Sequence, residues 1–413
     1  MAELARRLGV PDAVVIGLGS MLGAGVFVVF APAAAAAGGA GLLVALALAG
    51  FIAFCNAISS ARLAARYPES GGTYVYGRER LHPFAGFLAG WGFVIGKTAS
   101  CAAMALTIGA YLWPGRARLV AVLAVLAVTI VNLRGIGKTA AATRVLVGVV
   151  LTVLAVVAVT GAPHVAPDRL AGFADTGVRG VLTAAGLLFF AFAGYARIAT
   201  LGEEVRDPER TVPRAVPLAL GVVLAIYLML AVVAVGVLGE QRLADSTAPL
   251  AEVVTAAGLP DLAWLVRAGA TVAVTGVLLS LLAGVGRTTL AMARRRDLPG
   301  ALAAVHPRYR VPHRAELAVA AVVIVVVSLV DVRGAIGFSS CTVLVYYAIA
   351  NASALTLGRD PARKLPVQLL AALGLVGCLL LAVNLPVASV LTGFGVLALG
   401  AAWYVLRHTT RAT

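Results

Sequence analysis

The sequence has few charged residues, few cysteines and few histidines, and each shortage excludes a class of protein. Only 12% of the 413 residues are charged and 61% are hydrophobic, whereas soluble domains carry roughly a quarter charged residues. The four cysteines lie inside apolar runs, with no second cysteine or histidine at ligand spacing, which argues against disulfide and zinc frameworks. The five histidines lie in polar connecting segments. We therefore expect a protein whose main solvent is not water, without a metal or cofactor.

Long apolar runs fill almost the whole chain. Each has about 20 residues, which is enough to cross a hydrocarbon core ~30 Å thick. They predict an all-α integral membrane protein, with residues 1–413 forming a single transmembrane domain. We expect about twelve spans, at residues 12–36, 41–66, 84–113, 118–133, 140–162, 179–202, 214–238, 262–293, 315–331, 335–357, 365–383 and 387–406.

The net charge of +15 is distributed unevenly between the two ends of these spans. With the N-terminus taken as cytoplasmic, 23 of the 33 lysines and arginines fall on the inner side and seven on the outer side. The positive-inside rule then predicts that both termini are cytoplasmic, in the plasma membrane of a bacterium suggested by the Ala- and Arg-rich composition. The basic surplus orients the protein and can contact anionic lipid. It gives no reason to expect nucleic acid binding.

Two of the spans are interrupted at corresponding places. Residues 19–27 (GSMLGAGVF) put three glycines in the middle of the first span, and residues 189–195 (FFAFAGY) put one glycine among aromatic residues in the sixth. If spans one to five and six to ten are repeats, at 12–162 and 179–357, their odd number of spans makes the second repeat inverted. The helices at about 365–406 then stand outside the repeats. Such paired breaks are typical of transporters that hold their substrate at the breaks.

Several motifs resemble those of the amino acid-polyamine-organocation (APC) family of permeases, and the resemblance covers most of the chain. Residues 23–27 (GAGVF) match its G-[SA]-G-[IV]-F signature. Residues 203–214 (EEVRDPERTVPR) are similar to its E-E-x-x-[ND]-P-x-[RK]-x-[IL]-P pattern, and 287–299 and 346–351 resemble its eighth and tenth spans. The resemblance implies the fold of sodium-coupled amino acid symporters (the LeuT fold), with five plus five inverted helices and discontinuous helices 1 and 6. It also implies a cargo of amino acids or related amines.

A zwitterionic amino acid needs partners for its carboxylate and its ammonium, because unpaired charges away from water cost several kcal/mol each. A broken helix offers free N–H groups to the carboxylate and free carbonyls to the ammonium. Glycines and aromatic residues at such positions can also serve close packing alone. The candidate substrate-binding residues are the amides of Gly23, Ala24 and Gly25, the carbonyls of Met21, Phe190, Ala191 and Phe192, and the side chains of Phe192 and Tyr195.

Coupling and gating candidates are fewer. Lys97 is the one lysine at membrane depth, a position that suggests function by default, although a lysine can also extend its ammonium from a span to the interface. Ser280 is the best placed hydroxyl for sodium coupling. Arg197 can reach Glu203 or Glu204 as a structural or gating ion pair.

The acidic residues point to a neutral cargo. None of the 18 lies at mid-membrane. Members of the APC family that transport cations or protons often have an acidic residue just after the sixth-span break, and the resemblance puts Ala196 at that position in this chain. We therefore expect a secondary active transporter of neutral amino acids that works by alternating access, as a proton-coupled symporter or an exchanger. An exchanger or importer of cationic amino acids or polyamines is the alternative.

Two other classes fit the sequence less well. A channel needs a continuous polar lining, and a membrane enzyme needs paired acids, a histidine cluster or a nucleophile constellation. Neither pattern is visible, so we expect no enzyme. The expected partners are a small-molecule amino acid, the bilayer and a proton, and the protein is expected to be a monomer or a homodimer.

Overall fold

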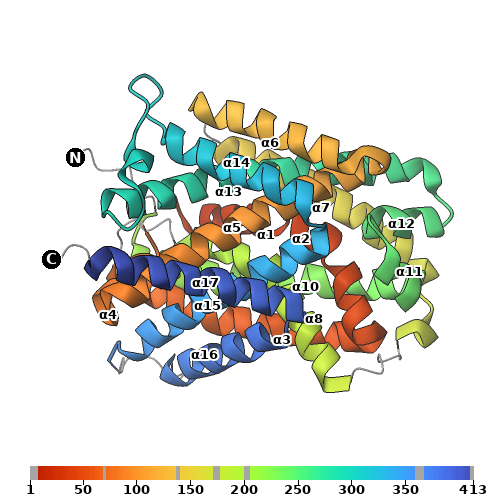
Figure 1. Ribbon diagram of the computed structural model, residues 1–413. Coiled ribbons are helices and arrows are strands. Elements are labelled where there is room, and N and C mark those ends of the chain that lie inside the picture. Colours follow the sequence, from red (N-terminus) through yellow and green to blue (C-terminus); the bar gives the residue numbers. More distant parts are fainter. Residues whose placement is uncertain are drawn as a thin grey trace.

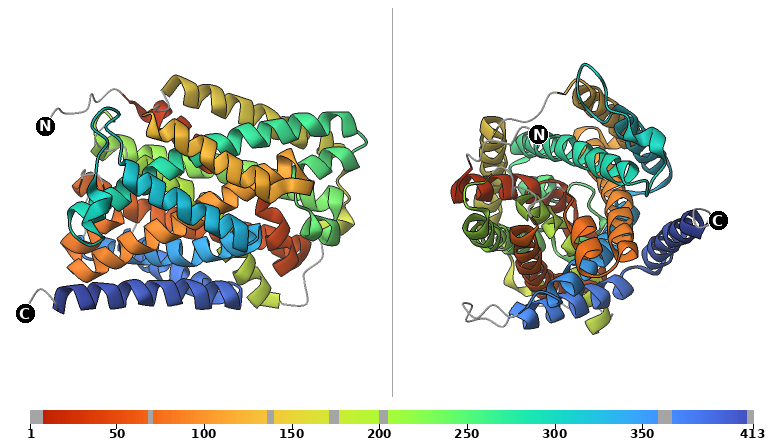
Figure 2. Two further views of the ribbon diagram at one scale, coloured as in Figure 1. Left: turned by 45° about the horizontal axis from the view of Figure 1, so that its top comes forward. Right: turned by 90° about the vertical axis from the view of Figure 1, so that its left-hand side faces the viewer.

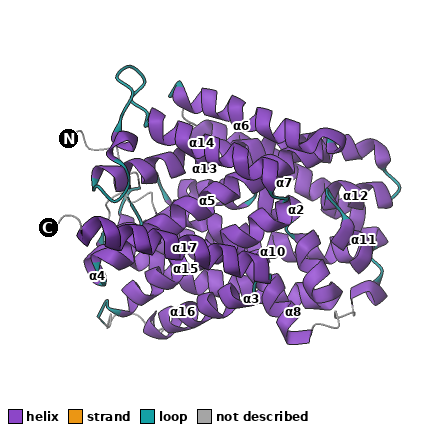
Figure 3. Ribbon diagram, in the orientation of Figure 1, coloured by secondary structure: helices purple, strands orange, loops and turns teal. Residues whose placement is uncertain are grey.

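The computed structural model describes residues 8–67, 71–135, 140–170, 177–199, 205–358 and 367–409. Within these ranges the regular structure is helical and no strand occurs (Figure 3). Most of the long helices pack lengthwise into one bundle (Figure 1). Eleven helical stretches in the described ranges are long and apolar enough to cross a membrane. The prediction of an all-α, multispanning fold is confirmed.

The helices of the candidate spans make up both halves of the chain, and the two interrupted spans include short ones. In the first half they are α1 (Val10–Met21), α2 (Ala24–Val28), α3 (Phe30–Arg66), α5 (Pro83–Leu112), α6 (Ala117–Leu133) and α7 (Ala140–Gly161). In the second half they are α8 (Gly177–Phe192), α9 (Ala196–Ala199), α10 (Pro208–Leu238), α13 (Ala263–Arg294), α14 (His313–Leu329) and α15 (Val332–Leu355). They are followed by α16 (Val367–Asn384) and α17 (Val387–Thr409). The expected span at 315–331 corresponds to α14, which has 17 residues.

The boundary between the first two spans lies inside α3. Gly38 has φ 72° and ψ −173° there, a left-handed region that glycine adopts without a Cβ penalty. Val29, between α2 and α3, keeps helical angles of −73° and −23°. The helix that starts at Ala24 therefore continues to the bend at Gly38, and the second span follows it, close to the predicted limits of 12–36 and 41–66.

Short helices close the two ends of the bundle. At one end lie α4 (Thr73–Arg80), the segment between α13 and α14, and the end of α17, whereas α11 (Glu240–Asp245) and α12 (Pro249–Ala256) lie at the other (Figures 1 and 2). The first end carries the segments that the sequence predicts to be cytoplasmic. The two breaks lie in the interior between these ends, against α5, α10, α13 and α15.

Candidate functional site

The first break separates α1 from α2. Leu22 has φ −78° and ψ 54°, and Gly23 has φ −117° and ψ −140°, so neither residue is helical. The Gly23 amide donates to the carbonyl of Met21 at 2.8 Å. The helix resumes at Ala24, and the first N–H groups of a helix have no intrahelical acceptor. The expected interruption of the first span is therefore present, with its glycine amide already bonded.

The second break is milder than the sequence predicts. After α8 ends at Phe192, Ala193–Tyr195 form one 3₁₀ turn, and α9 begins at Ala196. Phe192 and Ala196 both keep right-handed helical angles. A 3₁₀ turn tightens the helix and redirects its carbonyls without unwinding it. The sixth span is thus distorted at the predicted place, but it is not open there.

Glycines bring the two breaks into contact. A Cβ built on Gly25 would lie 2.5 Å from the Cα of Ala191, and one built on Gly194 would overlap the carbonyl of Ser20. A Cβ on Gly23 would lie 2.7 Å from a methyl group of Val277 on α13. These glycines therefore permit close packing, the alternative that the sequence left open. The same packing sets the carbonyls of both breaks side by side.

Tyrosine hydroxyls occupy the carbonyls at the breaks. Tyr227 Oη, on α10, lies 2.6 Å from the Met21 oxygen and 3.2 Å from the Ala191 oxygen, so one phenol contacts both breaks. Tyr347 Oη, on α15, donates to the Ala193 carbonyl at 3.4 Å. Buried carbonyls need partners, and these phenols supply them from neighbouring helices.

The sequence reasoning missed Tyr227, although the chain carries a signal for it. Between residues 215 and 238, Tyr227 is the only residue with a hydroxyl, amide or charged side chain. A single phenol in an otherwise apolar span usually has a specific acceptor when it is buried. Here its acceptors are two of the carbonyls that we predicted to bind an ammonium.

Aromatic rings close the space around the breaks. Phe192 and Tyr195 are both 0% exposed. The Phe192 ring packs against Tyr227 at a centroid distance of 5.2 Å, and the Tyr195 ring against Tyr347 at 5.1 Å. The Tyr195 hydroxyl is buried without a hydrogen-bond partner. The predicted aromatic residues therefore line the breaks, and in this structure the breaks are closed to solvent.

Lys97 lies inside the bundle on α5 and is 7% exposed. Its Nζ forms no hydrogen bond or salt bridge with any residue that the structure describes. Ser100, three residues later, bonds Ser339 of α15 at 2.6 Å, and Gly90, on the same helical face as Lys97, packs against Met292 of α13. Lys97 therefore lies on α5 near α13 and α15, without a hydrogen-bond or salt-bridge partner among the described residues.

The remaining predicted residues do not join the breaks. Ser280 on α13 is exposed, and its hydroxyl donates to Gly276 of its own helix at 3.3 Å. Arg197 on α9 is exposed. Glu203 and Glu204 lie outside the described residues, so the ion pair with Arg197 stays a prediction.

Glu316 is a buried acidic residue that the sequence does not single out. In the first turn of α14 it is only 2% exposed, and its Oε2 has no hydrogen-bond partner in the described residues. Its Cγ would lie 2.7 Å from a Cβ on Gly286 of α13, and the positive charge that acts on it is that of Arg287. A span boundary places a residue along the membrane normal, whereas burial depends on which neighbour the helix face meets.

A polar cluster joins three elements at the predicted cytoplasmic end. Asp297, just after α13, accepts from Tyr74 Oη at 2.6 Å and from Arg78 Nη1 at 2.9 Å, both on α4. Trp403 Nε1 of α17 donates to the Asp297 carbonyl at 3.1 Å. Burial and the bond to Asp297 raise the pKa of the Tyr74 phenol, so it remains a donor at neutral pH. The cluster fixes α4 and α17 to the end of α13.

Comparisons with known proteins agree on one family. A model of the amino acid permease family matches residues 12–359. An uncharacterized transporter of Mycobacterium tuberculosis is 63% identical over 408 residues, which cover 98% of this chain and 92% of that protein. The methylthioribose transporter of Bacillus subtilis is 28% identical over 334 residues, covering 76% and 72%. A branched-chain amino acid permease of Bacillus subtilis is 27% identical over 335 residues, covering 75% and 72%.

Proposed function

Because the chain belongs to the amino acid permease family, we propose that it carries neutral amino acids across the bacterial plasma membrane by alternating access. Its membership confirms the resemblance to APC permeases and makes it a multispanning transporter. The choice of cargo and the coupling mode are the proposed part. The observation that best supports a substrate site at the breaks is their meeting at one phenol, Tyr227.

The proposed binding step uses main-chain groups. The substrate carboxylate takes the N–H groups at the start of α2, where the helix dipole favours negative charge. The ammonium takes the carbonyls of Met21 and Ala191, replacing or sharing the bonds from Tyr227. In the closed state these two carbonyls share the one hydroxyl proton of Tyr227. Opening between α1, α8 and α10 is then needed to admit the substrate.

Electrical neutrality of the cargo is supported by the side chains. In the described part of the chain, no acidic residue lies beside either break, and Ala196 takes the position where cation carriers of this family often have an acid. One similar protein is named as a branched-chain amino acid permease, and branched-chain amino acids have uncharged side chains. A cationic side chain would have to leave water without a counter-charge, which costs several kcal/mol.

We propose proton coupling or exchange as the mode of transport, with Lys97 as the coupling group. It is a buried cation without a partner in the described residues, and an ionisable residue at this depth is a functional candidate. Ser280 bonds its own helix and is exposed, which favours a proton over sodium.

The test uses purified protein in liposomes with a panel of labelled amino acids. We expect uptake of neutral side chains such as leucine, with no uptake of lysine or putrescine. A pH gradient should drive accumulation, and a sodium gradient should not. Uptake of lysine or putrescine in preference to leucine would establish the cationic alternative, and counterflow without any gradient effect would establish exchange.

A further inference from the structure

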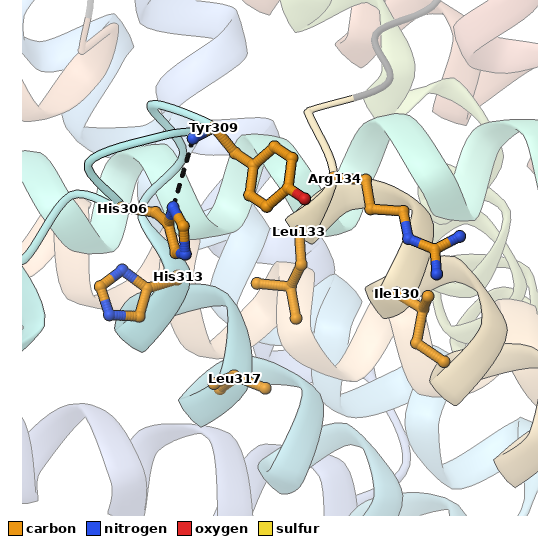
Figure 4. Close-up of a pocket in the computed structure, with 7 residues that line it drawn as sticks. All are labelled: Ile130, Leu133, Arg134, His306, Tyr309, His313 and Leu317. Carbon is orange, nitrogen blue, oxygen red and sulfur yellow. Dashed lines mark hydrogen bonds between the residues drawn. The ribbon is translucent and has the colours of Figure 1, made fainter.

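A pocket of about 320 Å³ lies at the predicted cytoplasmic end, away from the breaks, between the end of α6 and the start of α14 (Figure 4). Its apolar wall consists of Ile130 and Leu133 on α6 and Leu317 on α14. Ile130 is 51% exposed and Leu317 is 49% exposed. Both helices cross the bundle from this end, so the wall belongs to the level where acyl chains meet headgroups.

The rim of the pocket carries hydrogen-bond donors that have no acceptor. Within the described residues, the Arg134 guanidinium makes no ion pair or side-chain hydrogen bond, and the Tyr309 hydroxyl makes no hydrogen bond. His313 Nδ1 is buried and has no partner. No acidic residue is among the lining residues. The rim therefore favours an anion with several acceptor oxygens.

The rim is held in place by the loop that carries it. His306 Nδ1 accepts the backbone N–H of Arg308 and of Tyr309, each at 3.2 Å. The Tyr309 carbonyl packs against Gly135, whose built Cβ would lie 3.2 Å from it. Figure 4 shows the Tyr309 ring standing between His306 and Arg134. Tyr309 is therefore positioned next to the cation instead of being a loose surface residue.

We propose that this pocket binds an anionic phospholipid of the inner leaflet. The phosphate would accept from Arg134 and Tyr309, and an acyl chain would lie along the wall formed by Ile130, Leu133 and Leu317. Basic pockets between transmembrane helices on the cytoplasmic side are suited to anionic headgroups. A free phosphate would use the rim but leave the apolar wall uncovered, and a zwitterionic lipid would bring a second cation to a rim that is already basic. The combined rim and wall therefore fit an anionic lipid best.

The test measures bound lipid and does not depend on transport. Protein purified in detergent is exchanged into mixed micelles of phosphatidylglycerol and phosphatidylcholine, and lipid adducts are counted by native mass spectrometry. We expect one phosphatidylglycerol to be retained in preference to phosphatidylcholine. Arg134→Gln should weaken that adduct about tenfold, and Tyr309→Phe, which keeps the ring, should weaken it about threefold. Glycerol phosphate, which has the headgroup without the chains, should not compete at equal concentration.

Arg310→Gln is the matched control, because it removes the same charge at the same end of the bundle, next to Tyr309 in the chain, but Arg310 does not line the pocket. It should change retention by less than twofold. If Arg134→Gln and Arg310→Gln lost equal amounts of bound phosphatidylglycerol, retention would depend only on general surface charge, and the proposal would be overturned. Competition by glycerol phosphate would assign the rim to a soluble phosphate. Monodisperse elution of each variant in size-exclusion chromatography shows that the comparison is made on folded protein.

Discussion

At the scale of single residues, a closed transporter has to keep the main-chain groups of a broken helix hydrogen-bonded until substrate arrives. Tyr227 does this by contacting two carbonyls from different helices, at Met21 and Ala191. Because a phenol has one proton, it cannot bond both oxygens fully at once. The remaining acceptor capacity is what a substrate ammonium, with three donors, would use.

The first prediction concerns Tyr227→Phe. The ring and its contact with Phe192 are kept, but two buried carbonyls lose their donor, which costs about 1–3 kcal/mol. We expect the apparent melting temperature to fall by a few degrees and the KM for uptake to change, because the ammonium no longer competes with a hydroxyl. Tyr67→Phe, outside the breaks, is the control. An unchanged KM together with an unchanged melting temperature would contradict the role given to Tyr227.

A second prediction separates packing from binding at Gly25. In Gly25→Ala the new methyl group would meet the Ala191 backbone, so α2 and α8 must move apart, at a cost of about 1–3 kcal/mol. Uptake should fall at least tenfold while insertion into the membrane is kept. Gly148→Ala on α7 is the control, since a Cβ there meets nothing within 4 Å. Wild-type uptake by Gly25→Ala would show that the close approach of the breaks is not needed.

Lys97 gives a third prediction at this scale. In Lys97→Gln the buried positive charge is removed while most of the side-chain volume is kept. We expect accumulation driven by a pH gradient to be lost and counterflow of leucine to remain, as measured in liposomes. Thr98→Val, whose hydroxyl bonds only its own helix, should behave like wild type. Loss of leucine counterflow in Lys97→Gln would show that Lys97 has a structural role and is not the coupling group.

At the scale of elements, the sequence predicts the position of both breaks better than their form. Two non-helical residues interrupt the first span, and glycines at 19–25 are a direct signal for that. The interruption in the sixth span, residues 189–195, has a single glycine, Gly194, among aromatic residues, and it tightens into a 3₁₀ turn without opening. Gly194 also packs against the Ser20 carbonyl of α1, a contact between distant segments that no local pattern encodes.

The side chains that complete the site were harder to predict for the same reason. Apolar periodicity identifies helices and their approximate ends, and this recovered the all-helical fold. It does not say which helix faces which. Tyr227 acquires its role from the carbonyls of Met21 on α1 and Ala191 on α8, and these contacts exist only in the assembled bundle. Motif resemblance located the breaks and therefore carried most of the predicted site.

The fourth prediction concerns the joint between α4, α13 and α17. Asp297→Asn can still accept from Tyr74 but loses the ion pair with Arg78. Because the Asp297 carboxylate is nearly buried, we expect a loss of about 1–3 kcal/mol and a weaker closure of the cytoplasmic end. Faster maleimide labelling of the four native cysteines, all buried, would report that opening. Asp331→Asn, which caps α15, serves as the control, and equal labelling in both would refute the gating role.

At the scale of the whole molecule, the charge distribution and the arrangement of the short helices both distinguish one end of the bundle from the other. The end that carries α4, the 295–312 segment and the end of α17 is rich in arginine, whereas α11 and α12 close the other end (Figure 2). Lipid is the expected solvent for the side surface, where α16 and α17 expose many apolar side chains, including Leu391 at 68% and Leu399 at 69%. An anionic lipid in the Arg134 pocket would add a second orienting interaction to the positive-inside bias.

The orientation itself is the fifth prediction. The inner leaflet attracts basic segments and translocation of arginine-rich loops is disfavoured, so the 295–312 segment should face the cytoplasm and the α12–α13 connection should face outward. A single added cysteine at exposed Arg310 should react with an impermeant maleimide only after the cells are permeabilised, whereas one at exposed Asp261 should react in intact cells. The buried native cysteines give a low background for both. The reverse labelling pattern would show that the protein has the opposite orientation in the membrane. The Asp297 joint and the Arg134 pocket would then lie on the outer side.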